Sequence, residues 1–562
     1  MSWKLKEKAR VLLSQEKGTI IKSWGGKISV ALIFPNYYHV GMANLGFQIV
    51  YRIINDHPQA VCERAFLPQP LELLEFQRSS TPLFSLESQT PLQQFDIIAF
   101  SLSFENDYPN ILTLLDLARI PLRSFQRKEG YPLVCAGGVT TFLNPEPLAE
   151  FIDFFALGEA EELVPEWLNL LYELKAKKVL RREILKQLTQ VEGVYVPQLY
   201  SITYNEDGTI ASFSPKKGIP YPVKRRWIKN LNNYPAHSVI SSPNIELGGM
   251  SLLEIGRGCS FGCRFCAAGW IYRPVRFRSL NALEESLPSV LIQDNKIGLV
   301  SAAIGDHPKL KAICQIIQDK GGKISVSSLR ANAITSELLT ALKESGHQSI
   351  TMAPETGSER LRRLIRKNIT DEEIFAAVEL IALSGIPNLR LYFLLGLPSE
   401  TIADIDQIIS LAKKIKHTII KQVKKKTLPG TITLSLSPFV PKPFTPFQWV
   451  AFENLGVLNQ KIKHIQNGLK NERQIIITYD LPKWSYIQAL LSRSDRRAGK
   501  ILLEVHKKNG NWNKALQETD INPDFYVYRH REFNEILPWD FIDQGIKKET
   551  LISEYHQALT LS

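Results

Sequence analysis

The chain has 562 residues, of which 44% are hydrophobic and 22% charged, without low-complexity tracts or internal repeats. This composition excludes a disordered or fibrous protein and supplies apolar residues for several cores, so we expect three domains. Lys and Arg (68) outnumber Asp and Glu (56), which leaves a net charge of +12. Such a surplus can attract nucleic acid, but much of it lies in runs such as 413–426, which are typical of a solvated helix face.

Targeting signals are absent from the sequence pattern. No run of 18 apolar residues predicts a transmembrane helix, and the basic amphipathic segment 1–18 lacks the apolar region of a secretory signal. We therefore expect a cytoplasmic protein without a membrane span. The six cysteines, three of them crowded at 259–266, do not suggest a disulfide framework. In a reducing compartment such a cluster more often binds metal.

The first region, residues 1–175, alternates predicted strands with predicted helices. Strand patterns fall at 27–35, 95–103, 131–138 and 151–158, and helical spacing falls at 45–54, at 111–120 and from about 161. Apolar, β-branched strands in this alternation favour an α/β fold with a doubly wound, Rossmann-like parallel sheet. Ligands of such sheets lie beyond the carboxyl ends of the strands. Here those ends are Ser101–Ser103, Gly137–Gly138 and Gly158–Glu159, where we expect glycine to let the backbone approach a bulky ligand.

Residues 176–245 are predicted to form a linker. Alternating segments at 200–213 flank Asp207-Gly208, which indicates a hairpin. A connector rich in proline and arginine follows at 219–235. We expect this linker to have a small sheet of its own.

From 246 to 450 the strand–helix alternation resumes. Candidate strands lie at 252–256, 297–303, 323–328, 349–353, 389–395 and 432–437. Six such units predict a partial (β/α)6 barrel, whose chemistry should lie at the carboxyl ends of its strands. Between two of the strands, 370–385 is a helical pattern with Thr370 as N-cap and Gly385 at its end. The remaining residues, 451–562, are predicted to be a mainly helical cap.

Three cysteines, Cys259, Cys263 and Cys266, are spaced as residues on one face of a helix. Three buried thiols on a helix are therefore one reading, but Gly256, Gly258 and Gly262 disfavour a regular helix. A structural zinc site usually has four protein ligands, and no fourth Cys or His follows at a finger-like distance. A [4Fe–4S] cluster normally takes four thiolates, so three would leave one iron open. The spacing favours the cluster and leaves zinc and buried thiols as alternatives.

This CxxxCxxC loop after a first barrel strand, with Phe265 before its last cysteine, resembles the radical S-adenosylmethionine (SAM) superfamily over about 250–450. The resemblance implies a [4Fe–4S] cluster held by Cys259, Cys263 and Cys266, with SAM bound to the fourth iron. One electron then cleaves SAM and yields a 5′-deoxyadenosyl radical, chemistry that the cofactors perform while the protein orients them. It also implies an electron donor such as flavodoxin or ferredoxin.

The same resemblance implies a set of SAM-binding residues. Gly305-Asp306 corresponds to the motif that binds the methionyl amine, Ser328 and Glu355 to ribose contacts, and Arg330 to a contact with the methionyl carboxylate. Tyr272, Arg273 and Arg276 follow the cysteines and are expected either to face SAM or substrate or to pack beneath the first helix. Each residue has a plainer alternative: Asp306 as a helix cap, Arg330 in a surface pair, Glu355 beside an N-cap. No residue is assigned a catalytic role.

The segment 133–162 resembles a cobalamin-binding domain, and the whole chain resembles a little-characterised family that fuses this domain to a radical SAM barrel. The resemblance implies that corrin contacts come from Ser101, Ser103, Gly137, Gly138, Val139, Gly158 and Glu159. Cobalamin proteins that ligate cobalt carry Asp-x-His-x-x-Gly, whereas here Tyr37 precedes His39 by two residues and Gly41 comes one residue early. We therefore do not expect His39 to bind cobalt. Cobalamin bound without a protein ligand, and a domain that has lost the corrin, both stay open.

Three functions follow as hypotheses. The first is cobalamin-dependent methylation of an unactivated carbon, and the second is cobalamin-independent, methylthiotransferase-like modification of RNA or protein. The second draws on the basic charge and on the segment 437–447. The third is a non-catalytic role for the cluster, which the open iron disfavours. The dispersed Cys62, Cys135 and Cys314 are expected in the core, and the sequence leaves the substrate open.

Overall fold

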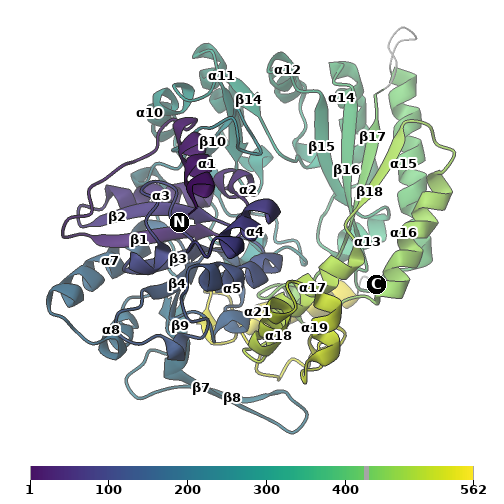
Figure 1. Cartoon of the computed structure of the whole chain (residues 1–562). Helices are drawn as coiled ribbons and strands as arrows, with labels where there is room; N and C mark the ends of the chain where they lie inside the picture. The colour runs from purple at the N-terminus through teal and green to yellow at the C-terminus, as the bar shows by residue number, and fades with distance from the viewer. Residues whose placement is uncertain (1, 423–429, 561–562) are drawn as a thin grey trace.

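The computed structural model describes residues 2–422 and 430–560. It shows an N-terminal sheet domain beside an open barrel, with C-terminal helices packed against both (Figure 1). Both halves are α/β layers of parallel strands and helices, so the predicted fold class is confirmed. None of the described helices has the length and apolar content that crossing a bilayer requires.

The N-terminal sheet has six strands in the order β2-β1-β3-β4-β5-β6. Their bounds are β1 (Ile28–Phe34), β2 (Ala60–Phe66), β3 (Ile97–Ser101), β4 (Leu133–Gly137), β5 (Phe154–Ala156) and β6 (Val194–Tyr195). The first five run parallel, and β6 is antiparallel to β5. Helices α3 (Leu45–Asp56) and α7 (Ala160–Ala176) pack on one face and α5 (Tyr108–Leu117) on the other, which makes the sheet doubly wound as predicted.

Strand β2 is missing from the sequence prediction because charged residues interrupt its apolar pattern. Arg64 is nevertheless fully buried, with its guanidinium between the carboxylates of Glu16 (2.6 Å) and Glu87 (2.7 Å). Glu63, also buried, accepts hydrogen bonds from Ser85 and from the indole of Trp24. Pairing of this kind makes a buried charge tolerable. The short β6 was missed as well.

The linker is tied to the end of the chain. Its hairpin, β7 (Tyr200–Tyr204) and β8 (Ile210–Pro215), forms as predicted, with Gly208 at φ +84° in the turn. This hairpin is a two-stranded sheet of the linker's own, as expected. A second linker strand, β9 (Val223–Lys224), pairs instead in parallel with β19 (Ile542–Asp543) from the C-terminal part.

The barrel consists of two parallel sheets. One contains β10 (Ser251–Glu254), β13 (Lys296–Val300) and β14 (Lys323–Ser325), and the other contains β15 (Ser349–Glu355), β16 (Asn388–Leu395), β17 (Ile432–Pro438) and β18 (Ile475–Tyr479). The two sheets meet at a single parallel bridge between Leu329 and Met352. All six predicted strands are present, but β18 extends the barrel sheet beyond residue 450, where we expected it to end.

Helices cover the outside of this open barrel (Figure 1). They are α10 (Leu280–Leu291), α11 (Leu310–Asp319), α12 (Ser336–Glu344), α14 (Asp371–Ser384), α15 (Ile402–Gln422) and α16 (Leu455–Leu469). Helix α14 begins at a capping box of Thr370 and Glu373 and ends at Gly385 in the left-handed region, as predicted. The basic run 413–426 is exposed at Lys413 and Lys414 of α15, and its last residues lie outside the described part of the chain.

The C-terminal part is mainly helical, as predicted. Its helices are α17 (Pro482–Arg493), α18 (Ala498–Lys507), α19 (Trp512–Glu518), α20 (Asp524–Val527) and α21 (Lys548–Leu559). Asn144 of the N-terminal domain donates to the carbonyls of Ser492 and Ser494, and Arg496 pairs with the buried Glu146 over 2.9 Å. The segment 492–497 therefore joins the C-terminal helices to the N-terminal sheet.

Gly138 and Gly158, at the ends of two strands, leave no room for a side chain because another part of the backbone lies against them. A Cβ on Gly138 (φ +109°) would lie 2.3 Å from the carbonyl oxygen of Leu102, and one on Gly158 (φ +136°) 2.1 Å from that of Arg226. Close approach of a ligand, which the sequence suggested as the reason for these glycines, is not needed to explain them.

We predict that Gly158→Ala lowers the free energy of unfolding by about 3 kcal/mol, because it combines a strained φ with a backbone clash. The control is Gly130→Ala, at a glycine that also has a positive φ (+92°) but no atom within 4 Å of its Cβ. We expect that variant to lose only about 1 kcal/mol. Denaturant unfolding measures both changes, and equal losses would contradict the role of the clash.

Candidate functional site

The three cysteines lie on a loop between two short strands, β11 (Gly256–Arg257) and β12 (Arg276–Phe277). Gly258 and Gly262 have φ of +94° and +62°, so the loop does not continue as a helix, and the reading of three thiols on one helix face is wrong. A Cβ on Gly258 would lie 2.5 Å from the carbonyl oxygen of Tyr272. The glycine lets the loop turn tightly against the short helix α9 (Ala268–Ile271).

The three thiols lie near one another and form a set of candidate metal ligands. Cys263 is buried and Cys259 and Cys266 are partly exposed, and each interacts electrostatically with a neighbour in the set. Burial raises the pKa of the Cys263 thiol to about 11, and the nearby ammonium of Lys367 opposes that rise. Among the described residues, no three His, Cys, Asp or Glu side chains converge on one point suited to a single ion. A cubane cluster does not need such convergence, because each thiolate binds a different iron.

Two of the expected SAM residues contact the cysteine loop directly. Asp306 Oδ2 accepts a hydrogen bond of 2.6 Å from the hydroxyl of Ser260. The guanidinium of Arg330 lies 3.5 Å from the ring centroid of Phe261. Gly305 packs against Ala333, where a Cβ would be only 2.3 Å from the alanine Cβ. The structure therefore brings strand ends of the barrel against the loop that the sequence singled out.

Two further expected residues lie at the ends of β14 and β15. Ser328 is exposed, beyond the last residue of β14. Glu355 ends β15 after a bulge, with φ +69°, and its Oε1 accepts from the ammonium of Lys367 over 2.7 Å. Lys367 was not identified from the sequence, because a lysine after a helix carries no pattern that predicts a partner.

The last helix of the chain holds the cysteine loop from the other side. Arg264, between Cys263 and Phe265, is buried and donates to Glu554 of α21 over 3.0 Å and to the carbonyl of Leu364 over 2.7 Å. Glu554 also pairs with Arg366. Phe265 packs against a cluster of apolar residues that includes Tyr555 and Ala558 of α21. Nothing in the sequence indicated this contact between residues about 290 apart.

A cavity of about 450 Å³ lies between the carboxyl ends of the N-terminal strands and the barrel. Its lining includes all seven residues expected at a corrin: Ser101, Ser103, Gly137, Gly138, Val139, Gly158 and Glu159. Small side chains such as Ala99 and Ala156 leave the space open, and Leu45 and Ile49 of α3 contribute an apolar wall. The seven residues that the resemblance to a cobalamin-binding domain singled out therefore lie together around one cavity.

Tyr272, which was expected either to face SAM or substrate or to pack beneath the first helix, lies on the wall of this cavity. Its ring is edge-on to Phe142 of the N-terminal domain at 5.8 Å between centroids, and burial raises the pKa of its hydroxyl to about 12. Its neighbour Arg273 stacks on Trp270 at 4.4 Å. Arg276 is buried, and its guanidinium pairs with the carboxylate of Glu159 over 2.7 Å.

Ion pairs connect the cavity wall to the cysteine loop. Arg257, two residues before Cys259, contacts Glu159 (3.2 Å), Glu161 (2.7 Å) and Glu254 (2.9 Å). Burial opposes ionisation of Glu159, but the hydrogen bonds from Arg276 and the charge of Arg257 outweigh it and lower the pKa of this carboxyl. The negative charge of Glu159 therefore stabilises the ion pairs with Arg257 and Arg276, and its side chain also lines the cavity.

His39 lies apart from the cavity, beside Tyr37 at 5.9 Å between ring centroids. Among the described residues, no histidine lines the 450 Å³ cavity.

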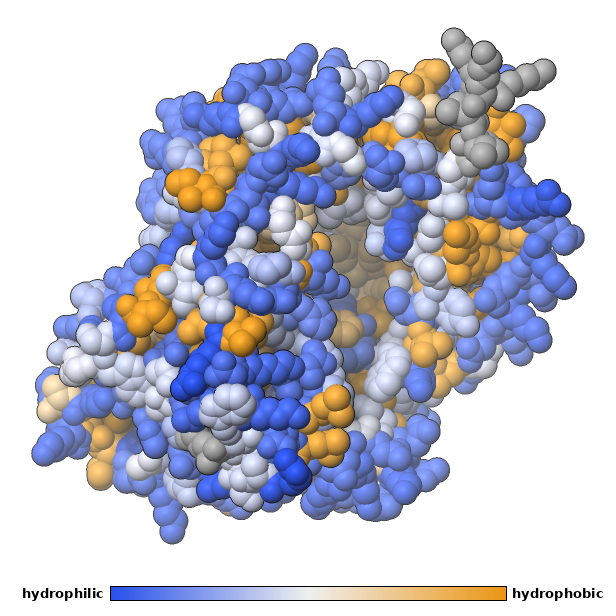
Figure 2. Space-filling model, turned by 45° about the horizontal axis from the view of Figure 1, so that its top comes forward, coloured by the Kyte–Doolittle hydropathy of each residue, from blue (hydrophilic) through white to orange (hydrophobic). Residues whose placement is uncertain are grey.

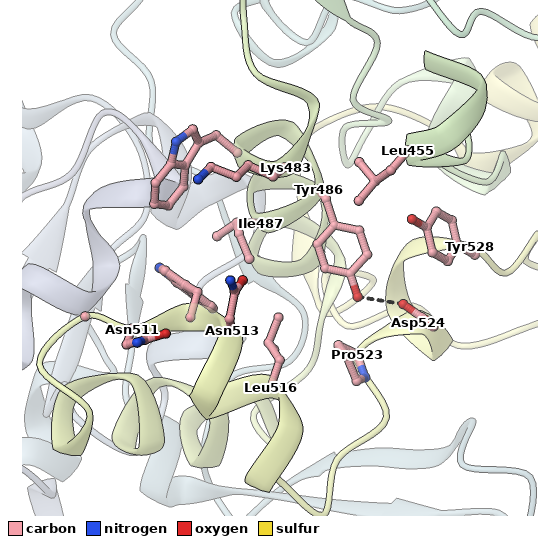
Figure 3. A pocket seen from close by; sticks show the side chains of 13 residues that line it. Leu455, Lys483, Tyr486, Ile487, Asn511, Asn513, Leu516, Pro523, Asp524 and Tyr528 are labelled. Atoms are coloured by element: carbon pink, nitrogen blue, oxygen red, sulfur yellow. Dashed lines mark hydrogen bonds between the residues drawn. The ribbon is translucent and has the colours of Figure 1, made fainter. Parts of the chain in front are cut away.

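A second cavity, of about 570 Å³, lies among the C-terminal helices and contains none of the sequence-predicted site residues (Figure 3). There the hydroxyl of Tyr486 points to Asp524 and donates to it over 2.6 Å. The surface also has a deep hollow beside the half of the barrel that carries α15 and α16, with apolar atoms in its depth (Figure 2). The cysteine loop and the 450 Å³ cavity are therefore the part of the molecule where the predicted groups meet.

Two known sequence families match the chain. The family described as radical SAM proteins, N-terminal, matches residues 46–197, which include most of the N-terminal sheet and the cavity wall. The radical SAM superfamily matches residues 253–412, which include the cysteine loop and the barrel strands from β10 to β16.

Two relatives extend this match. The chain is 31% identical over 478 residues to the uncharacterized protein MJ0966 of Methanocaldococcus jannaschii, which covers 84% of this chain and 90% of the relative. It is 22% identical over 326 residues to the threonylcarbamoyladenosine tRNA methylthiotransferase MtaB of Thermotoga maritima, which covers 51% of this chain and 72% of that protein.

The fold is similar to that of the radical SAM methyltransferase TsrM from Kitasatospora setae, solved with cobalamin and a [4Fe–4S] cluster bound. The TM-score is 0.53 at 12% identity, and the match covers 88% of this chain and 100% of that one. At this identity the likeness concerns the fold alone. The family matches, the long relative and the cysteine loop agree, and the chain belongs to the radical SAM superfamily of enzymes, which use a [4Fe–4S] cluster and SAM.

Proposed function

We propose that this protein is a cobalamin-dependent radical SAM enzyme that methylates an unactivated carbon, with SAM as source of both the radical and the methyl group. One observation carries the proposal: the seven residues expected at a corrin line one cavity of about 450 Å³, which borders the loop of the three cysteines. Tyr272 and Arg257 belong to both the cavity wall and the cysteine-bearing segment.

In this proposal each group of residues has a defined task. Cys259, Cys263 and Cys266 hold the cluster, which when bound supplies the electron for reductive cleavage of SAM. Asp306 accepts from the methionyl amine and Arg330 donates to the carboxylate, because each has the charge opposite to its partner. Ser328 and Glu355 bind the ribose, and Gly305 keeps the strand end close to Ala333.

The N-terminal sheet contributes the cofactor cavity and excludes water. Small residues at the strand ends leave space for a flat macrocycle, and the apolar wall of α3 removes solvent from one side. Because the cavity lining among the described residues contains no histidine, we propose that the corrin binds without a side-chain imidazole on cobalt. The reaction would take place in the cytoplasm, with flavodoxin or ferredoxin as electron donor.

The second candidate is cobalamin-independent modification of RNA or protein. It is supported by the similarity to a tRNA methylthiotransferase and by the net charge of +12. Against it, the cysteines outside the loop lie apart: Cys62 in β2, Cys135 in β4 and Cys314 in α11, all buried. They do not form the second cysteine-rich site that an auxiliary cluster would use.

We predict that Cys259→Ala, Cys263→Ala and Cys266→Ala each lower the bound iron of anaerobically reconstituted protein from about four per chain to near zero. Each variant should also lose SAM cleavage, measured as 5′-deoxyadenosine. The matched control is Cys314→Ala, which removes a buried thiol in α11, outside the loop, and should keep its iron. Zinc in place of iron in the wild type would refute the cluster.

We predict that anaerobically reconstituted protein retains cobalamin through gel filtration and that Val139→Trp abolishes this retention. The indole would fill part of the 450 Å³ cavity, whereas Val139→Ala enlarges it and should retain the corrin. Both variants should keep their iron, because Val139 lies outside the cysteine loop. Wild-type protein that cleaves SAM but never retains a corrin would favour the second candidate.

We predict that Glu554→Gln accelerates iron loss to a chelator roughly tenfold, because Arg264 and Arg366 lose a charged partner worth about 1.5 kcal/mol. The control is Glu549→Gln, an exposed carboxylate in the first turn of the same helix. Absorbance of the cluster against time measures the rate. Equal rates for the two variants would show that α21 does not hold the loop.

A further inference from the structure

Lys367 is buried next to the cysteine loop. It lies three residues after α13 (Glu359–Leu364), and its side chain is only 8% exposed. Its ammonium donates to Oε1 of Glu355 over 2.7 Å, and the Glu355 side chain is itself 13% exposed. Removing two charges from water is costly, so the pair depends on the close contact between them.

The ammonium of Lys367 holds the carboxylate of Glu355, whose direction is set by an unusual backbone conformation. Glu355 follows a β-bulge in β15 and has φ +69°, a region that residues other than glycine rarely adopt. Bulges of this kind redirect a side chain at the end of a strand. Without Lys367, the redirected carboxylate would be free to rotate and would lie half-buried without a cation.

Lys367 also fixes a second residue of the site. Its carbonyl oxygen accepts a hydrogen bond of 2.6 Å from Nη2 of Arg330, whose guanidinium lies over the ring of Phe261 in the cysteine loop. The side chain of Lys367 thus holds Glu355, and its backbone holds Arg330. These are the residues proposed to bind the ribose and the methionyl carboxylate of SAM.

The segment that carries Lys367 also contacts the cysteine loop through its backbone. Arg264, which follows Cys263, donates its backbone N–H to the carbonyl of Ile365, two residues before Lys367, over 3.0 Å. A cubane cluster on three thiolates is an anion that gains a further negative charge on reduction. A cation beside it therefore stabilises the reduced form and raises the midpoint potential.

We propose that Lys367 is a positioning residue of the SAM site: it orients Glu355 and Arg330, and its charge favours reduction of the cluster. The inference rests on the proposed SAM site and is independent of cobalamin. A protein that never retains a corrin would end the proposed methylation and leave this inference standing.

Three variants test it. Lys367→Met removes the charge, Lys367→Arg keeps it, and the double variant Lys367→Met/Glu355→Gln removes both partners of the pair. Arg363→Met, which loses an exposed charge from α13, is the control. Isothermal titration measures SAM affinity, and titration followed by electron paramagnetic resonance measures the midpoint potential of the reconstituted cluster.

For Lys367→Met we expect SAM affinity to fall roughly tenfold and the midpoint potential to become more negative, because Glu355 is left uncompensated. Lys367→Arg should stay close to wild type in both. The double variant should recover the midpoint potential, since the net charge is restored, but not the affinity, since Glu355 no longer binds. The control should change neither.

Two results would overturn the inference. One is wild-type affinity and potential in Lys367→Met. The other is equal damage in Lys367→Arg and Lys367→Met without recovery of the potential in the double variant, which would make Lys367 merely part of the packing. If Lys367→Met does not fold, the comparison of Lys367→Arg with the double variant decides, because both preserve the net charge of the pair.

Discussion

Buried arginines on the cysteine segment determine where the three thiols lie, and the rest of the site depends on them. Arg257 precedes the cysteines and contacts Glu159 and Glu161 of the N-terminal domain, while Arg264 lies among them and contacts Glu554 of the last helix. A guanidinium does not lose its proton in a protein, and burying it without a partner costs several kcal/mol. The loop can therefore adopt only a path on which both arginines reach their carboxylates.

These contacts place the cluster ligands between two parallel-stranded units. Carboxyl ends of the N-terminal strands line the cavity on one side, and strand ends of the barrel bring Asp306, Arg330 and Glu355 to the other. In the proposed function this arrangement would suit chemistry between two cofactors, because each would be held by a different unit while one loop borders both. Membership of the radical SAM superfamily identifies the cluster and SAM, and the cavity is the basis for proposing the corrin.

Much of the fold was predictable, because apolar patterns repeat along the chain. Six of the seven barrel strands and four strands of the N-terminal sheet were predicted in place, as was the capping of α14. Strand β2 was missed because its Glu63 and Arg64 look solvent-exposed in the sequence and are buried only through distant partners. Strand β18 was missed because a five-residue strand after a helix has no distinctive pattern until β17 lies beside it.

The sequence by itself identified the three cysteines as metal ligands, the glycines that prevent a helix at that position, and the strand–helix alternation that makes both units α/β. Each of these features is carried by residues close to one another in the chain. Only the tertiary structure decided that Tyr272 lines the 450 Å³ cavity, that Lys367 holds Glu355, and that α21 holds the cysteine loop through Glu554. An ion pair leaves no periodic trace in a sequence, whether its partners lie 12 residues apart, as Lys367 and Glu355 do, or 290 apart, as Arg264 and Glu554 do. Its partners become identifiable only when the folded chain excludes water around them and each buried charge needs an opposite one.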